Sequence, residues 1–147
     1  MDNLEFRLAS PDLSDSVCAM FSRVQTLDGV QADNLARRME GVKQHFTDHS
    51  TRGVLVAMYN GEIIGMLCIY VQGSINRLSH LTVDQRFRRR HIASTLLQLA
   101  ERHEGVRVLT TLVRSDNLAA IDMLTKCQYI QMGEMLSGQW LHFERQF

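Results

Sequence analysis

The sequence is short of the features that mark specialised classes of protein. Of its 147 residues only one is proline and three are cysteine, and the formal net charge is zero. A zero net charge argues against a protein that mainly coats nucleic acid, because such binding depends on many phosphate contacts. Cys18, Cys68 and Cys127 are odd in number, far apart and flanked by apolar residues. That pattern is typical of buried free thiols in a reducing compartment.

The chain also lacks an apolar run of the roughly 20 residues that a membrane-spanning helix needs. Its first residues show no basic segment followed by an apolar one, so no signal peptide is expected and we expect a cytoplasmic protein. The histidines have no spacing typical of a zinc site, so no metal is expected. Without repeats, linkers or low-complexity segments, residues 1–147 are expected to form one domain with its own core.

What the sequence does contain is a regular succession of strand and helix patterns. Residues 4–8 alternate apolar and polar side chains, as a strand does. Ser10, Pro11 and Asp12 are favoured where a helix starts, and Asn60-Gly61 favours a two-residue hairpin turn. Further helices are expected at about 33–48, at 91–103 and from a cap at 115–117 to about 126, with strands at 53–59, 62–71, 75–84, 106–113, 129–132 and 139–145.

The resulting order, β-α-α-β-β-β-α-β-α-β-β, predicts an α/β (α+β) protein. The first strands form an antiparallel meander, whereas strand–helix–strand units in the second half imply a parallel pair. We therefore expect a mixed, mostly antiparallel central sheet of about seven strands with about four flanking helices.

One short basic segment indicates chemistry: residues 88–93, Arg-Arg-Arg-His-Ile-Ala. It lies between a predicted strand and a predicted helix, whose first turn has unpaired N–H groups and a partial positive charge. Cations are disfavoured there unless an anion binds, in which case N–H groups, helix dipole and guanidinium groups would converge on phosphate oxygens. A solvated basic turn explains this segment equally well by itself, and a nucleic-acid patch explains it less well.

Residues 81–83, Leu-Thr-Val, followed by residues 88–93, resemble the acetyl-CoA motif of the GNAT superfamily of acyl-CoA-dependent N-acetyltransferases. The family loop reads Gln/Arg-x-x-Gly-x-Gly/Ala. Arg88 matches its first position and Ala93 its last, whereas His91 stands where the family has glycine. Glycine lets a backbone approach the pyrophosphate closely, so His91 implies a wider fit.

A second segment, which starts at Asn117, is similar to the family pattern Asn-x-x-Ala-x-x-x-Tyr-x-x-x-Gly-Phe. Asn117 and Ala120 match it, Leu124 replaces the tyrosine, and Gln128-Tyr129 replaces Gly-Phe. Asn117 alone is weak support, because Ser-Asp-Asn before a helix is first of all a cap. Both motifs in the right order make a more specific pair.

The resemblance implies a GNAT-like acyl-CoA N-acyltransferase fold over essentially the whole chain, with acetyl-CoA as co-substrate. The pantetheine arm is expected to pair with the fourth strand, where the family's strands splay apart, and the pyrophosphate is expected to bind the loop. The expected cofactor-binding residues are Leu81, Thr82, Val83, Arg88, Arg89, Arg90, His91, Ile92, Ala93, Ser94 and Asn117.

The implied reaction is direct attack by a primary amine of a small molecule or peptide. Such an amine has a pKa of about 10, so a base is needed. His80 is our candidate, placed by alternation on the sheet face of Leu78 and Thr82, although a histidine with a purely structural place in the sheet is an equal alternative. Because Leu124 cannot donate a proton, Tyr129 is a weak candidate for the general acid; packing of its ring is the better interpretation, and a water or no dedicated acid are alternatives.

The acceptor is expected between the first two helices and the far ends of the central strands. Asp28, Asp33 and Glu40 are candidates for contacting a cationic amine there, although ordinary surface acids explain them better. Trp140 is a candidate for an acceptor pocket or a dimer contact, with core packing the better interpretation, and relatives suggest a homodimer. A non-catalytic acyl-CoA-binding module, and a nucleic-acid-associated protein that uses residues 86–90, remain alternatives to the enzyme.

Overall fold

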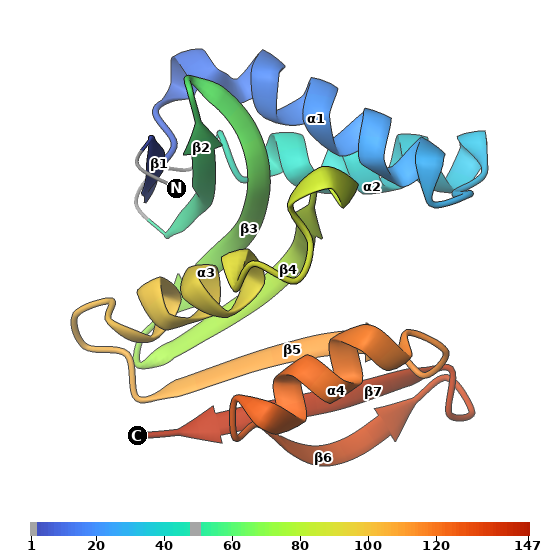
Figure 1. The fold of residues 1–147 in the computed structure, drawn as a ribbon. Helices are drawn as coiled ribbons and strands as arrows, with labels where there is room; N and C mark the ends of the chain where they lie inside the picture. The colour runs from blue at the N-terminus through green and yellow to red at the C-terminus, as the bar shows by residue number, and fades with distance from the viewer. Residues whose placement is uncertain (1–2, 48–50) are drawn as a thin grey trace.

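A computed structural model describes residues 3–47 and 51–147, which form one seven-stranded sheet flanked by four α-helices (Figure 1). The helices are α1 (Ser14–Leu27), α2 (Ala32–Gln44), α3 (Ile92–Glu101) and α4 (Leu118–Lys126), with 3-10 turns η1 (Pro11–Leu13) and η2 (Gln85–Phe87). The strands are β1 (Leu4–Leu8), β2 (Arg52–Tyr59), β3 (Glu62–Gln72), β4 (Ile75–Val83), β5 (Val108–Arg114), β6 (Ile130–Met135) and β7 (Trp140–Gln146).

The predicted element order and fold class are confirmed. The strands lie in the order β1-β2-β3-β4-β5-β7-β6, and the pairing is antiparallel except between β4 and β5. The helix expected to start at Ser10 begins as the 3-10 turn η1 and continues as α1 from Ser14. The Ser10 hydroxyl donates to Asp12 instead of capping a backbone N–H. α2 ends at Gln44, before the expected end at Asp48, which lies outside the described residues.

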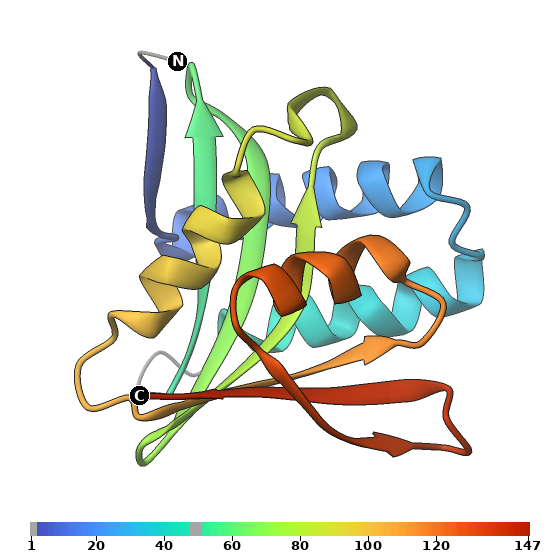
Figure 2. The same cartoon turned by 60° about the horizontal axis from the view of Figure 1, so that its bottom comes forward.

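The helices cover both faces of the sheet (Figure 2). On one face α1 and α2 pack over β2 and β3, with Val17, Phe21 and Val42 in the core. On the other face α3 packs over β2, β3 and β4, and α4 lies toward β5 and β7. The buried residues of this second core include Leu78, Ile92, Leu96, Leu97 and Leu124. The central strands β3 and β4 are therefore fixed from both sides.

The parallel pair β4–β5 is joined along only part of its length. Residues 75–78 of β4 pair with residues 108–111 of β5, after which the two strands diverge although both continue, to Val83 and Arg114 (Figure 2). A cavity lies between the diverging ends and is lined by both strands. The splay that the family resemblance implied is therefore present at the expected strand.

A bulge interrupts the alternation of β4 near the splay. Met66 of β3 faces Thr82 and Cys68 faces Ser79, so Leu67 alone lies opposite two residues of β4. His80, one of these two, has φ of 56°, in the left-handed region that non-glycine residues seldom adopt. The bulge therefore changes which face the following side chains occupy.

Gly65 in β3 lets α3 approach the sheet closely. A Cβ built at this position would lie 3.0 Å from Ile92 Cγ2, 3.5 Å from Ala57 Cβ and 3.6 Å from Leu96 Cδ1. Ile92 is the first residue of α3, so this contact sets the position of the helix N-terminus. Within residues 3–47 and 51–147 no helix combines the length and apolar character needed to cross a bilayer; the cytoplasmic location stays a prediction.

Candidate active site

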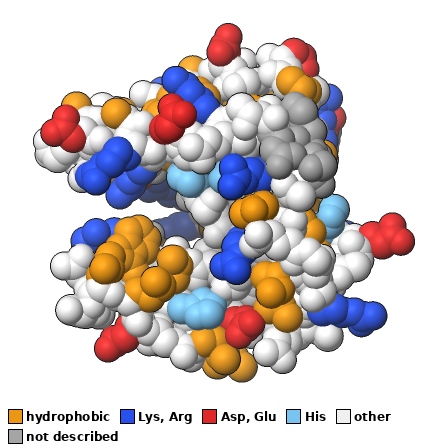
Figure 3. Space-filling model, turned by 180° about the vertical axis from the view of Figure 1, so that it is seen from behind, with side chains coloured by type: hydrophobic (Ala, Val, Ile, Leu, Met, Phe, Trp, Pro, Cys, Tyr) orange, Lys and Arg blue, Asp and Glu red, His pale blue; other side chains and the backbone are white. Residues whose placement is uncertain are grey.

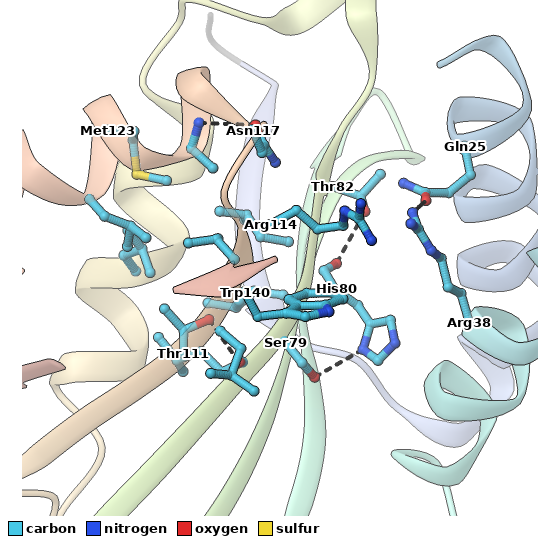
Figure 4. A pocket seen from close by; sticks show the side chains of 18 of the residues that line it. Gln25, Arg38, Ser79, His80, Thr82, Thr111, Arg114, Asn117, Met123 and Trp140 are labelled. Carbon is cyan, nitrogen blue, oxygen red and sulfur yellow. Dashed lines mark hydrogen bonds between the residues drawn. The ribbon is translucent and has the colours of Figure 1, made fainter. Parts of the chain in front are cut away.

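The cavity between β4 and β5, which we call the slot, has a volume of about 800 Å³. Its walls come from residues 77–82 of β4, residues 110–114 of β5, α1, α2, α4 and Trp140 of β7. Seen from behind, it opens as a cleft with Lys and Arg side chains along the upper wall, below α1 and α2 (Figure 3). The side chains inside are shown in Figure 4. A cavity of this size with several polar side chains in its walls is a candidate site for a ligand.

The N-terminus of α3 presents free backbone donors. His91 is its N-cap with φ of 61°, and Arg89 has φ of 64°, so two non-glycine residues of the loop are left-handed. The first-turn N–H groups of Ile92, Ala93 and Ser94 have no acceptor among the described residues. Such an array of N–H groups at a helix N-terminus fits a phosphate group.

The left-handed conformation at His91 explains why glycine suits this position. An L-residue there is strained by roughly 1–2 kcal/mol, whereas glycine is not. The Ser94 and Thr95 hydroxyls both donate to the His91 carbonyl, at 3.1 and 2.7 Å. These two bonds hold the N-cap in place, and they leave the Ser94 backbone N–H, not its hydroxyl, as the donor for an anion.

The three arginines of the loop lie differently from one another. The Arg88 guanidinium donates to the Val83 carbonyl at 3.2 Å and to Asp28 Oδ2 at 2.9 Å, which ties the loop to β4 and to the end of α1. Arg90 lies over the Phe87 ring at 5.7 Å, and Arg89 is exposed. Contact of these guanidinium groups with a phosphate stays a prediction, because in this conformation Arg88 already has a carboxylate partner.

Asp84, which the sequence did not single out, holds the loop between β4 and α3 in place through hydrogen bonds. It is 4% exposed and accepts hydrogen bonds from the Arg86 backbone, the Arg86 guanidinium and Arg23. These bonds, chiefly those from the Arg86 side chain, lower the pKa of Asp84 from 3.8 to about 2. Arg86 also pairs with Glu62 at 2.8 Å, so it is part of the same network.

The expected pantetheine-binding residues lie along the slot. Leu81 and Thr82 line it, and from Ser79 onward β4 has no partner strand on the side of β5 among the described residues. An unpaired strand edge offers main-chain donors and acceptors to an extended ligand. Val83 packs against the core below α3. Asn117 lines the opposite wall; its Oδ1 accepts from Ala120 N at 3.2 Å, which leaves the amide Nδ2 as a donor. These groups fit an acyl-CoA arm.

His80 lies at the inner wall of the slot on the α1–α2 side. Its ring packs edge-on against Phe21 and His45, with centroids 5.9 and 6.0 Å apart, and Nδ1 is 2.9 Å from Ser79 Oγ (Figure 4). The expectation that His80 shares a face with Leu78 was wrong, because Leu78 belongs to the α3 core and the bulge breaks the alternation. His80 does share its face with Thr82, whose partner Met66 packs under α1.

The His80 ring is fitted closely against α2. A Cβ built on Gly41 would lie 3.0 Å from both Cε1 and Nε2 of His80, so α2 has room for the ring only because residue 41 is glycine. Burial, reinforced by His45 when it is protonated and by the charge of Arg38, lowers the pKa of His80 from 6.5 to about 4. Burial also lowers the pKa of His45, whose Nδ1 donates to the Gly41 carbonyl at 2.7 Å. Both histidines are therefore neutral at pH 7.

This lowered pKa predicts a stability that depends on pH. Below pH 6.5 an unfolded His80 takes up a proton while the folded one stays neutral down to about pH 4, so the folded state loses stability as the pH falls through this window. We expect up to about 1.4 kcal/mol per pH unit from His80. Urea unfolding of the wild type and His80→Gln at pH 7 and pH 5 measures it: the variant should lose less, keeping only the smaller His45 contribution. Equal losses would contradict the burial of His80.

Tyr129 does not reach the slot. Its phenol is buried, donates to Glu101 Oε1 at 3.4 Å and lies near Arg145, and burial raises its pKa above the ordinary value. Tyr129 is absent from the residues that line the slot, whereas Leu124 is among them. The placement favours the packing interpretation of Tyr129, and its role as an acid stays a prediction without a structural contact to support it.

The end of the slot beside α2, where an acceptor is expected, is basic rather than acidic. Asp28 is paired with Arg88, and Asp33 and Glu40 do not line the slot. Trp140 lines the slot, so its side chain reaches the cavity, and its role in an acceptor pocket stays a prediction. Arg38 and Arg114, which the sequence did not single out, line the same end. No local pattern could have found them, because they are more than seventy residues apart and meet only through the fold.

Comparison with known proteins gives one family. Residues 20–129 match the family model described as the acetyltransferase (GNAT) family. None of the curated proteins matches the sequence.

Solved structures share the fold. The PaiA N-acetyltransferase from Thermoplasma acidophilum in complex with coenzyme A has a TM-score of 0.82 at 14% identity, over 98% of this chain and 99% of that one. The GNAT domain of S. lividans PAT has 0.78 at 16%, over 98% and 90%. The ribosomal-protein-alanine N-acetyltransferase from Brucella melitensis has 0.73 at 20%, over 97% and 99%. At these identities the likeness shows the fold alone.

Proposed function

The chain belongs to the GNAT acetyltransferase family, and we propose that it transfers the acetyl group of acetyl-CoA to a primary amine of a small molecule or peptide. One observation carries the proposal, the arrangement of three features around the slot. The unpaired edge of β4 lines it, its basic end holds the neutral His80, and the N-terminus of α3 nearby has N–H groups without an acceptor among the described residues. In the reaction the amine nitrogen bonds to the acetyl carbon, the carbon–sulfur bond breaks, and the proton lost by nitrogen ends on the thiol.

The binding roles follow from the positions of the donors. The N–H groups of Ile92, Ala93 and Ser94 hold the pyrophosphate, with Arg89 and Arg90 beside them. The free edge of β4 and the Asn117 amide hold the pantetheine arm. Acetyl-CoA, when bound, supplies an acyl carbon activated by its thiol leaving group. Arg88 and Asp84 keep the loop in the shape that presents these donors.

His80 is proposed to accept the proton that the amine loses during acylation. Nδ1 is engaged with Ser79 Oγ, so Nε2, which packs against Gly41 of α2, is the nitrogen left for this task. A pKa of about 4 keeps the ring unprotonated at pH 7, yet makes it too weak to deprotonate an alkylammonium ion with a pKa near 10. The amine must therefore enter in its neutral form, and His80 acts only as the carbon–nitrogen bond forms.

The test is release of free thiol from acetyl-CoA in the presence of a panel of amines. Amine-dependent thiol, with the acetylated amine identified by mass, supports the enzyme. Binding of coenzyme A without thiol release from any amine supports the non-catalytic acyl-CoA module instead, for which His91 and Leu124 argue. Retention on DNA or RNA at physiological salt would favour the nucleic-acid alternative.

A homodimer also belongs to this proposal. β6 lies at one edge of the sheet and exposes Ile130, Met132 and Met135. An open strand edge with apolar side chains is suited to a partner. Light scattering is expected to give about twice the mass of the 16.8 kDa chain, and a monomer at all concentrations would exclude the dimer.

A further inference from the structure

We infer that the acceptor is a small molecule that carries a carboxylate or phosphate group besides its amine, and that Arg38 and Arg114 bind that anionic group. This inference rests on the proposed function, because it names the class of amine that the slot accepts. We call Arg38 and Arg114 the acceptor arginines.

The acceptor arginines come from opposite walls of the slot. Arg38 projects from α2 and Arg114 from the end of β5, and the two side chains point toward one another across the opening, with His80 and Trp140 beside them (Figure 4). A second cavity of about 410 Å³ is lined by both of them, by His80 and Trp140, and by Asn34 and Arg37. Three guanidinium groups therefore surround a space that borders the candidate base.

These guanidinium groups have little negative charge near them. Arg38 donates to the Gln25 side chain and Arg37 to the Asn34 side chain, both of which are neutral. No ion pair of the described residues involves either arginine. Arg114 lies 3.6 Å from the exposed Asp116 and 5.5 Å over the Trp140 ring. The exposed Asp116 is thus the one carboxylate paired with these three arginines among the described residues, and the remaining positive charges repel each other unless an anion lies between them.

The chemistry of the groups identifies the anion. A guanidinium group presents a fork of N–H donors that matches the two oxygens of a carboxylate or phosphate. Two forks facing each other hold such a group from both sides, whereas a polyamine or an aminoglycoside would bring further positive charge to the same place. The acids that the sequence offered for a cationic amine are not available: Asp28 is paired with Arg88, and Asp33 and Glu40 lie outside the slot. Asp116 lines the slot but is paired with Arg114.

The site is separate from the loop at the N-terminus of α3. None of residues 88–94 lines either cavity, and the acceptor arginines lie on the side of α2 and Trp140. Because His80 lines both cavities, an anion held by the acceptor arginines would leave the amine of the same small molecule facing His80 and the slot. The site thus sets both the identity and the direction of the acceptor.

The experiment compares matched amines in the thiol-release assay. The pairs are β-alanine with propylamine, aminomethylphosphonate with methylamine, and glutamate with putrescine, and an acidic peptide with a free N-terminus is added. We expect turnover with anionic small molecules at a kcat/KM at least about tenfold above that of their partners, the effect of one charge-assisted hydrogen bond.

Arg38→Gln and Arg114→Gln should each raise the KM for the anionic acceptor by about ten- to a hundredfold and leave the KM for acetyl-CoA unchanged. Arg107→Gln, an exposed arginine outside both cavities, is the control and should change neither.

Binding is measured separately, so that the result does not depend on turnover. Inorganic phosphate is titrated by calorimetry into protein saturated with coenzyme A, which occupies the α3 loop, and Arg38→Gln should bind it at least about tenfold more weakly than the wild type. Equal phosphate binding would overturn the inference, as would turnover confined to neutral amines, polyamines or the peptide. Those outcomes leave the proposed acetyl transfer intact. The opposite result is also possible to recognise: if phosphate binding depends on Arg38 but no amine releases thiol, the transfer is refuted and the anion site remains.

Discussion

Replacing Ser94 by glutamate is expected to raise the KM for acetyl-CoA by about a hundredfold while leaving the fold at least as stable. Ser94 is the third residue of α3, where a carboxylate would lie among the N–H groups proposed to hold the pyrophosphate. Two like unit charges about 5 Å apart repel by about 3 kcal/mol at an effective dielectric constant near 20, which is about a hundredfold in affinity. Measured KM values for acetyl-CoA, and direct titration with coenzyme A, test this.

The two effects of this substitution have opposite signs, which makes it diagnostic. The first turn of α3 has no acidic residue, so a glutamate there stabilises the helix by about 0.3–1 kcal/mol. The lost Ser94 hydroxyl bond matters little, because Thr95 still donates to the His91 carbonyl. A variant that melts at or above the wild-type Tm yet binds coenzyme A poorly would locate the anion at this helix end.

Gln98→Glu is the matched control. Gln98 lies one turn further along α3 and is exposed, so the same charge is added beyond the first turn. Its KM for acetyl-CoA should rise only a few-fold, through long-range repulsion between the new carboxylate and the pyrophosphate, since salt screens an exposed charge at this distance. Equal KM values for Ser94→Glu and the wild type would remove the pyrophosphate from the N-terminus of α3 and with it the proposed binding mode.

The sequence predicted the fold well because most of its signals are local. Short stretches of consecutive residues predict the hairpin at Asn60-Gly61, the cap at Asn117 and the buried face of α3. The structure has all three where expected. The resemblance to the GNAT family, carried by residues 81–83, 88–93 and the segment from Asn117, is likewise confirmed by the family match. Boundaries differ by a few residues, because helix and strand ends depend on tertiary contacts.

The parts that could not be predicted depend on contacts between distant residues. The bulge at His80 has no local mark, since the left-handed conformation there is imposed by pairing with β3 and by packing on Gly41. The bond from Arg23 to Asp84 spans sixty-one positions. The acceptor arginines likewise become neighbours only when α2 and β5 are placed on either side of the slot. Binding specificity is therefore the property that the sequence conveys least.

Gly65→Val is expected to cause the largest loss of stability, about 3 kcal/mol or somewhat more. Its Cβ would lie 3.0 Å from Ile92 Cγ2, and the two further methyl groups of valine would press on Ala57 and Leu96 in a buried interface. Overpacking a core costs about 1–3 kcal/mol, at the upper end where backbone must move. For a chain of this size the Tm should fall by about 10 °C, and because Ile92 begins α3, the KM for acetyl-CoA should also rise.

Gly133→Val separates this crowding from the general cost of a new valine. Gly133 is also a strand glycine, in β6, but a Cβ at that position meets nothing within 4 Å. Valine there should be neutral or slightly stabilising, because β-branched residues favour strands and replacing glycine lowers the conformational entropy of the unfolded chain. Thermal unfolding with and without coenzyme A measures both variants. If Gly65→Val unfolds at the wild-type Tm and binds coenzyme A equally well, α3 is not held against β3 by this contact, and the position of its N–H groups must be set by the Asp84 network alone.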